Sequence, residues 1–168
     1  MLAMVNSKNR EDIKKRFNLP PDTILWLLLD QTAHLFHRAL EAEIKPYGIS
    51  LEQAAALAVI NAIGDGATTG ELAQWLFLTP HSVSEMMTRM EKKGLVNKIA
   101  DRTSKRRKIL TITAKGRQLF QQTQKMKTIR RLMSHLSEEQ RQQMSSGLVL
   151  LREKAIQDLA MPKQLLYP

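Results

Sequence analysis

Apolar side chains recur at intervals of three and four residues along most of this chain, a spacing that places them on one face of an α-helix. Only six prolines and seven glycines interrupt the 168 residues, so we expect helices to dominate. The predicted helices cover, in order, residues 22–45, 51–64, 69–76, 80–93, 114–133 and 138–161. Residues 1–20 precede them as a polar N-terminal arm.

Several helix starts are marked by specific residues. Ser50, Thr68 and Ser137 each begin a capping box, in which a hydroxyl residue is followed three positions later by Gln or Glu. Thr79 is followed by a proline, which suits the first helical position because no N–H is needed there. Thr113 is expected to cap the helix that follows it.

The helix after Thr79 is predicted to have two different faces. Apolar residues form the inward face: Val83, Met86, Met87 and Met90. Polar residues form the outward face: His81, Ser82, Ser84, Glu85, Thr88 and Arg89. Gly94 supplies a left-handed stop, and strand-like residues 95–99 and 109–112 then flank the basic run 101–108. Together with the preceding short helix and its turn, this order predicts a winged helix-turn-helix.

The positive charge is concentrated in one block. The sequence holds 26 Lys and Arg against 16 Asp and Glu, a net charge of +10. Residues 80–131 alone hold 15 Lys and Arg against 3 Asp and Glu, and the rest of the chain is slightly acidic. A solvated surface usually mixes the two signs, so this segregation indicates a surface that meets phosphate groups.

The last predicted helix carries a narrow apolar stripe, typical of a helix–helix seam, made of Met144, Leu148, Leu151, Ala155 and Leu159. A helix of about 21 residues spans roughly 30 Å, more than a small winged domain needs for its own core. Packing within one chain would also account for the stripe, but we expect both chain ends to form a dimerisation layer. The expected organisation is an arm at 1–20, a dimerisation and cleft-forming layer at 21–64, a DNA-binding domain at 65–116, and C-terminal dimerisation helices at 117–168.

The segment from Glu71 to Gly116 resembles the winged helix-turn-helix of the MarR (multiple antibiotic resistance regulator) family of bacterial transcription factors. The matching motifs are Glu71-Leu72-Ala73, Thr79-Pro80 with Val83-Ser84, Glu91-Lys92-Lys93-Gly94-Leu95-Val96, and Ile112-Thr113-Ala114-Lys115-Gly116. The resemblance implies a homodimer whose recognition helices enter successive major grooves of a pseudo-palindromic operator. Family members usually repress nearby genes, sometimes activate them, and often release DNA when a small anionic or aromatic effector binds.

The first turns of the recognition helix are the part that reaches base edges. His81, Ser82 and Ser84 can each donate or accept a hydrogen bond there, and Glu85 can accept from a cytosine amine; we expect at least one of them to read a base. The alternative is that Ser82 only caps the helix and that His81 touches phosphate. Arg89 is expected at a phosphate rather than a base.

The wing supplies the strongest candidates for phosphate and minor-groove contact, namely Arg102, Lys105, Arg106 and Arg107. Arg106 matches the wing arginine of the family. Ser104 stands where the family usually has an aspartate that orients this arginine, so that support is absent. Lys98 and Lys108, on the strands, are interpreted as solvated.

The first helix holds a weaker candidate site. His34 and His37 are three residues apart, a usable ligand spacing, but no second cluster of ligands accompanies them, so no metal site is predicted. A partly buried, hydrogen-bonded pair is the expected arrangement. With Trp26 and Arg38, the two histidines are also candidates for an effector cleft between the dimerisation layer and the winged domain.

Phe77 occupies a turn position where the family more often has a small or polar residue, next to Trp75. We interpret the two aromatic residues as part of a local core cluster. The alternative is that they line a ligand pocket.

Other function classes find little support. The chain has no cysteine, and therefore no disulfide and no thiol chemistry. It has no phosphate-cradling glycine loop or nucleophile–base arrangement, so we expect neither an enzyme nor a cofactor. The polar start and the short apolar run at 24–29 predict a cytoplasmic protein without a membrane segment, since a span needs about 20 apolar residues. A winged module that binds RNA or a protein partner is the main alternative to DNA binding.

Overall fold

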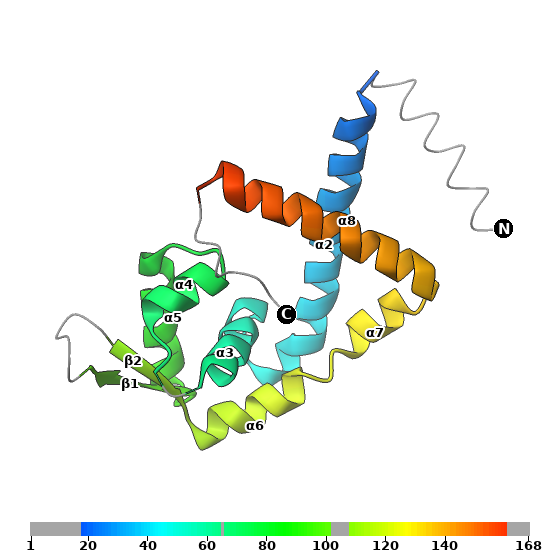
Figure 1. Ribbon diagram of the computed structural model, residues 1–168. Coiled ribbons are helices and arrows are strands. Elements are labelled where there is room, and N and C mark those ends of the chain that lie inside the picture. Colours follow the sequence, from blue (N-terminus) through cyan, green and yellow to red (C-terminus); the bar gives the residue numbers. More distant parts are fainter. Residues whose placement is uncertain (1–17, 65, 102–107, 161–168) are drawn as a thin grey trace. The chain divides into compact units, whose positions relative to one another are not determined.

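The structure, a computed structural model, describes residues 18–160 except 65 and 102–107. The chain divides into two compact units, Met1–Ala39 and Leu40–Pro168, and each is described by itself. Its helices are α2 (Pro21–Ile44), η1 (Lys45–Tyr47, a 3₁₀ turn), α3 (Leu51–Ile63), α4 (Thr69–Trp75), α5 (Pro80–Lys92), α6 (Ala114–Thr123), α7 (Lys127–Met133) and α8 (Glu138–Asp158), and its strands are β1 (Val96–Ala100) and β2 (Lys108–Ile112) (Figure 1). The prediction of a mostly helical chain with a small β-hairpin is confirmed.

The helix starts follow the side-chain signals in the sequence. At Ser50, Thr68 and Ser137 both hydrogen bonds of the capping box are present. Thr79 and Thr113 each accept a backbone N–H through the hydroxyl, as expected. Each such cap satisfies an N–H that the helix itself leaves unpaired, which stabilises the fold by about 1 kcal/mol.

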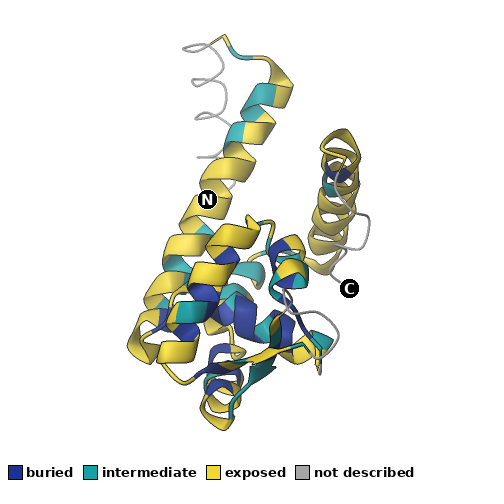
Figure 2. Cartoon of the chain, turned by 90° about the vertical axis from the view of Figure 1, so that its left-hand side faces the viewer, coloured by how far each residue is buried: buried dark blue, intermediate teal, exposed yellow. Residues whose placement is uncertain are grey.

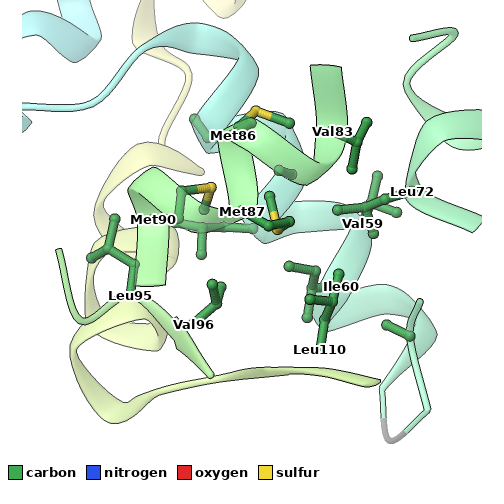
Figure 3. Packing of buried hydrophobic residues seen from close by; sticks show 14 of the residues in the cluster. Val59, Ile60, Leu72, Val83, Met86, Met87, Met90, Leu95, Val96 and Leu110 are labelled. Atoms are coloured by element: carbon green, nitrogen blue, oxygen red, sulfur yellow. The ribbon is translucent and has the colours of Figure 1, made fainter. Parts of the chain in front are cut away.

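The core of the C-terminal unit is assembled around the apolar face of α5. Met87 and Met90 are fully buried, and Figure 3 shows the methionines of α5 beside side chains of α3, α4 and the hairpin. Leu110 of β2 reaches the same cluster from the opposite side, close to Ile60 of α3. Burying each of these side chains contributes about 1.5–3 kcal/mol, so the polar face of α5 is held outward by its apolar face.

The hairpin is antiparallel and is tied to the start of α4. Val96 pairs with Ile112 and Ala100 with Lys108, one residue displaced from the predicted strand limits. Thr68 forms a bridge to Ile109, and the Leu110 amide donates to the Ala67 carbonyl at 2.7 Å. The hairpin is therefore fixed at its base to the helix-turn-helix.

Two helices end in the same hydrogen-bonding motif with different residues at its left-handed position. After α5, Gly94 has φ +70° and the Leu95 amide bonds to the Met90 carbonyl. After α4, Phe77 has φ +53° and the Leu78 amide bonds to the Ala73 carbonyl. Glycine adopts this conformation without a steric penalty, whereas phenylalanine is strained there. The short turn of the helix-turn-helix thus stores backbone strain.

The prediction of a single helix over residues 114–133 is wrong, because this segment forms two helices, α6 and α7. Thr123 turns its hydroxyl onto the Leu119 and Phe120 carbonyls, and Met126 adopts a left-handed conformation with φ +36°. The carboxylate of Glu43, at the end of α2, then accepts the first amides of α7. A cap supplied from a distant helix replaces the bonds of the broken turn.

Most of α8 is exposed. Among its residues only Ile156 is buried, whereas Leu148 and Leu151 of the predicted stripe are 36% and 55% exposed (Figure 2). In the N-terminal unit, Leu25, Trp26 and Leu35 of α2 are each more than half exposed. Of the helices that the structure describes, none combines the length and the hydropathy that a membrane crossing requires.

Candidate nucleic-acid interface

The polar face of α5 presents the predicted recognition residues to solvent. The exposed residues are His81, Ser82, Ser84, Glu85 and Arg89. The opposite face of the helix is buried and consists of Val83, Met86, Met87 and Met90. Because Thr79 and Pro80 fix the start of the helix, these residues occupy its first two turns and a little beyond. Five of the six residues that the sequence assigned to this face are therefore exposed, and the sixth, Thr88, is half-buried.

Glu85 lies between a histidine and an arginine on that face. Its carboxylate is 3.4 Å from His81 Nε2 and 3.9 Å from Arg89 Nη1, each one helical turn away. All three side chains are more than half exposed, so these contacts are weak and easily exchanged for others. An incoming phosphate or base would compete with Glu85 for both partners.

Ser82 has a structural role in addition to its predicted one. Its amide donates to Thr79 Oγ1, and the two hydroxyl oxygens lie 2.9 Å apart. Ser82 therefore takes part in the N-terminal cap of α5, as one of the two interpretations expected. Base reading by Ser82 stays a prediction, as it does for His81 and Ser84.

Lys98 is not simply solvated, so that interpretation is wrong. Its side chain is only 20% exposed, and its ammonium lies 3.1 Å from Glu91 Oε2 and 2.9 Å from Thr88 Oγ1. The Lys98 amide also donates to Glu91 Oε1 at 3.2 Å. These bonds tie β1 to the last turns of α5 (Figure 1), so the wing and the recognition helix are held as one body. Lys108 is exposed, as expected.

The predicted wing contacts Arg102, Lys105, Arg106 and Arg107, and with them Ser104, lie outside the described residues. Their roles stay predictions. The two strands that flank them are described and pair from Val96–Ile112 to Ala100–Lys108.

The candidate effector residues Trp26, His34, His37 and Arg38 lie on α2 and are exposed. His34 Nδ1 is 3.8 Å from Asp30 Oδ1, and the His34 side chain is 78% exposed. His37 is exposed as well, so the expectation of a partly buried histidine pair is wrong. Within the described ranges, no group of three or more potential ligands forms a metal site. An effector role for these residues stays a prediction.

The two aromatic residues of the turn behave differently. Trp75 is partly buried and packs against the core, as expected. Phe77 is 46% exposed, so it is not a core residue. It stands at the surface in the strained turn immediately before α5.

Sequence reasoning missed the groups that fix the end of α5. Lys93 donates to the Gly48 carbonyl, and Lys115 donates to the Lys93 carbonyl, each at 2.8 Å. These bonds join segments 45 and 22 residues apart, and no local pattern in the sequence signals them. They lie beside a cavity of about 350 Å³.

Comparison with known proteins agrees with this geometry. Residues 47–107, which run from η1 through the recognition helix to the wing, match the model of the MarR family. Solved structures of regulators from this family superimpose on most of the chain at 25–29% identity. The chain is similar to regulators of the MarR family. This confirms the resemblance seen in the sequence and the interpretation of the chain as a regulator rather than an enzyme.

Three relatives illustrate the likeness of this chain to known proteins. The organohalide-sensing regulator RdhR, in its 2,4-dichlorophenol-bound form, aligns with a TM-score of 0.74 at 29% identity over 81% of this chain and 82% of that one. MepR of Staphylococcus aureus, in complex with DNA, aligns with a TM-score of 0.71 at 25% identity over 77% of this chain and 96% of that one. The transcriptional activatory protein BadR of Rhodopseudomonas palustris is 25% identical over 99 residues. That last match covers 58% of this chain and 57% of BadR.

Proposed function

We propose that this protein is a homodimeric, sequence-specific regulator of the MarR family that binds double-stranded DNA through α5 and the wing. The observation that carries the proposal is the division of α5 into a buried methionine face and an exposed face of His81, Ser82, Ser84, Glu85 and Arg89. A rigid helix with such a face suits the major groove, where hydrogen-bonding groups distinguish all four base pairs. The relative MepR has been solved in complex with DNA, which supports DNA binding by this chain.

The charge distribution supports binding to a duplex. The block 80–131 contains α5, both strands, α6 and most of α7. With 15 Lys and Arg against 3 Asp and Glu, its net charge of +12 exceeds the +10 of the whole chain. Because Lys98 holds β1 against α5, the wing would approach the phosphates that flank the groove that α5 enters. Each neutralised phosphate releases condensed counterions, so affinity should depend steeply on salt.

A second copy of the chain is the proposed occupant of the apolar surface of α8. Leu148 and Leu151 are substantially exposed along a helix that has one buried residue of its own. Leu148 also lines an apolar groove of about 340 Å³ between α7 and α8. In that groove the Nε of Arg152 is buried without a hydrogen-bond partner, which is costly unless a partner subunit supplies an acceptor. A dimer interface over this surface would cover the exposed leucines and could supply a hydrogen-bond acceptor for Arg152 Nε.

We propose repression as the direction of control, with a small effector that releases the protein from DNA. A bound repressor occupies its operator and thereby excludes other proteins from the promoter. The relative RdhR binds 2,4-dichlorophenol, which supports an effector for this chain. The name of BadR, an activatory protein, makes activation the second candidate. A promoter reporter assay in cells with and without the protein distinguishes repression from activation.

A gel-shift assay on the DNA upstream of the chain's own gene, with an RNA competitor, tests DNA binding. We expect a shifted complex that unlabelled cognate DNA removes and that RNA does not. Ser84→Ala should reduce the preference for the cognate duplex over a single-base variant, by about 1–3 kcal/mol where the serine contacts a base. Ser146→Ala, an exposed serine on α8, is the matched control and should leave that preference unchanged. Competition by RNA as strong as by cognate DNA would favour an RNA-binding module instead.

A further inference from the structure

A cavity within the C-terminal unit is lined by both apolar and cationic side chains. Its volume is about 350 Å³, and it lies where η1, the end of α5 and the first turns of α6 meet. Ile49, Leu95 and Leu119 give it an apolar side, while Lys93 and Lys115 give it a cationic one. Pockets for small molecules begin at about 300 Å³, so the space is sufficient for a compact organic ligand.

Both ammonium groups are held in place by the backbone. Lys93 Nζ donates to the Gly48 carbonyl at 2.8 Å and to Gln53 Oε1 at 3.4 Å. Lys115 Nζ donates to the Lys93 carbonyl at 2.8 Å. An ammonium has three N–H donors, so one donor of Lys93 and two of Lys115 remain for a ligand. Because the two side chains are already ordered, binding loses little of their conformational entropy.

Within the described part of the chain, the two charges are not neutralised. Over the described residues 18–101 and 108–160, neither Lys93 nor Lys115 has an ion-pair partner. The described residues that line the cavity include no carboxylate, and its polar rim is completed by the amides of Gln118 and Gln122. Two like charges that line the same cavity attract an anion and repel a cation.

We infer that this cavity binds a small organic carboxylate, with its anionic group at Lys93 and Lys115 and its apolar body against Ile49, Leu95 and Leu119. The apolar side favours an organic acid over an inorganic anion, since a hydrated sulfate or phosphate gains nothing from it. Tyr47, which is 38% exposed, borders the same space and offers a ring face to an aromatic ligand. The cavity shares no residue with the candidates Trp26, His34, His37 and Arg38 on α2.

The position of the site links it to the recognition helix. Lys93 is the C-cap residue of α5, and Lys115 donates to its carbonyl. A carboxylate bound there would contact the end of α5 and the base of α6 at once. The regulatory meaning of the site rests on the proposed function, but its occupancy does not, so binding is measured on the full chain without DNA.

Isothermal titration calorimetry with benzoate tests the inference, with the neutral isostere benzamide and with sulfate as comparison ligands. We expect benzoate to bind at least about tenfold more tightly than benzamide, because the amide has no charge for the two ammonium groups. We expect sulfate to bind more weakly than benzoate. In ¹H–¹⁵N spectra of the full chain, the amides of Gly48 and Lys115 should shift on addition of benzoate.

A matched pair of charge variants on α6 locates the site. Gln118→Glu adds a negative charge at the rim and should weaken benzoate binding at least about tenfold. Gln121→Glu adds the same charge to the same helix outside the cavity and should leave affinity within about twofold, since exposed charges are screened. Both residues are exposed, so both variants should unfold at the temperature of the wild type.

Three results would overturn the inference. These are an absence of benzoate binding to the wild-type chain, equal binding of benzamide or sulfate, and equal effects of the two glutamate variants. A chain that binds benzoate as expected but not the operator would refute the proposed function and leave this site in place.

Discussion

Gly116, near the start of α6, is the position where a single added methyl group should do the most damage. A Cβ built there would overlap the carbonyl oxygen of Leu95 and lie 3.0 Å from its carbonyl carbon. That carbonyl also accepts the Thr113 amide at 3.1 Å, so it cannot move without breaking a second contact. Because the obstacle is backbone, no rotamer change relieves it.

The expected cost of Gly116→Ala follows from these contacts. Overpacking a close contact costs about 1–3 kcal/mol, and a weakened hydrogen bond adds about 1 kcal/mol. The better helix propensity of alanine returns at most about 1 kcal/mol. We therefore expect the free energy of unfolding to fall by about 2–3 kcal/mol, measured by urea denaturation at one fixed protein concentration.

Gly70→Ala is the matched control. Gly70 is also helical, but its added Cβ would meet only Thr68 Oγ1, at an ordinary 4.0 Å. Its free energy of unfolding should stay within about 1 kcal/mol of the wild type, on the stabilising side. If Gly116→Ala were as stable as Gly70→Ala, the close approach of α6 to β1 would be incorrect, and with it the placement of the cavity beside Lys115.

Three further predictions concern the other contacts that hold this fold and its interface. Hydrogen bonds from the side chain and amide of Thr128 lower the pKa of Glu43, so the stabilisation by its carboxylate is present above the ordinary pKa of a glutamate and is lost as pH falls through the lowered pKa. Glu43→Gln should therefore lower the free energy of unfolding by about 1 kcal/mol at neutral pH and make stability less dependent on pH in acid, as measured by urea denaturation across the acid range. Lys98→Met should lower stability by about 1 kcal/mol and weaken DNA binding in gel shifts, and an unaltered affinity would show that the wing needs no latch. Leu148→Glu combined with Leu151→Glu should give monomeric or unfolded protein in sedimentation, and a folded dimer would refute the proposed interface.

Features encoded within a few residues could be predicted from the sequence. The capping boxes at Ser50, Thr68 and Ser137 each need only a hydroxyl and a side chain three positions later, and all three form. The two faces of α5 follow from spacings of three and four, so the exposed recognition face was predicted residue by residue. Gly94 ends α5 as expected because its conformation depends on that residue alone.

Features that depend on distant segments could not be predicted. The break between α6 and α7 requires the carboxylate of Glu43, 84 residues before Lys127 in the chain. Lys98 looks like an exposed strand residue until the hairpin folds back toward Glu91. The cavity needs η1, α5 and α6 together, and neither Lys93 nor Lys115 has a sequence neighbour that indicates an anion site.

The central claim is that two copies of α5 and its wing bind one DNA duplex together. A hydroxyl-radical footprint of the wild-type chain on its upstream DNA, repeated at rising salt, tests it most directly. We predict two protected segments centred about 10 base pairs apart on a pseudo-palindrome, with an affinity that falls steeply as salt increases. Protection of a single segment, or an affinity that does not change with salt, would contradict the account.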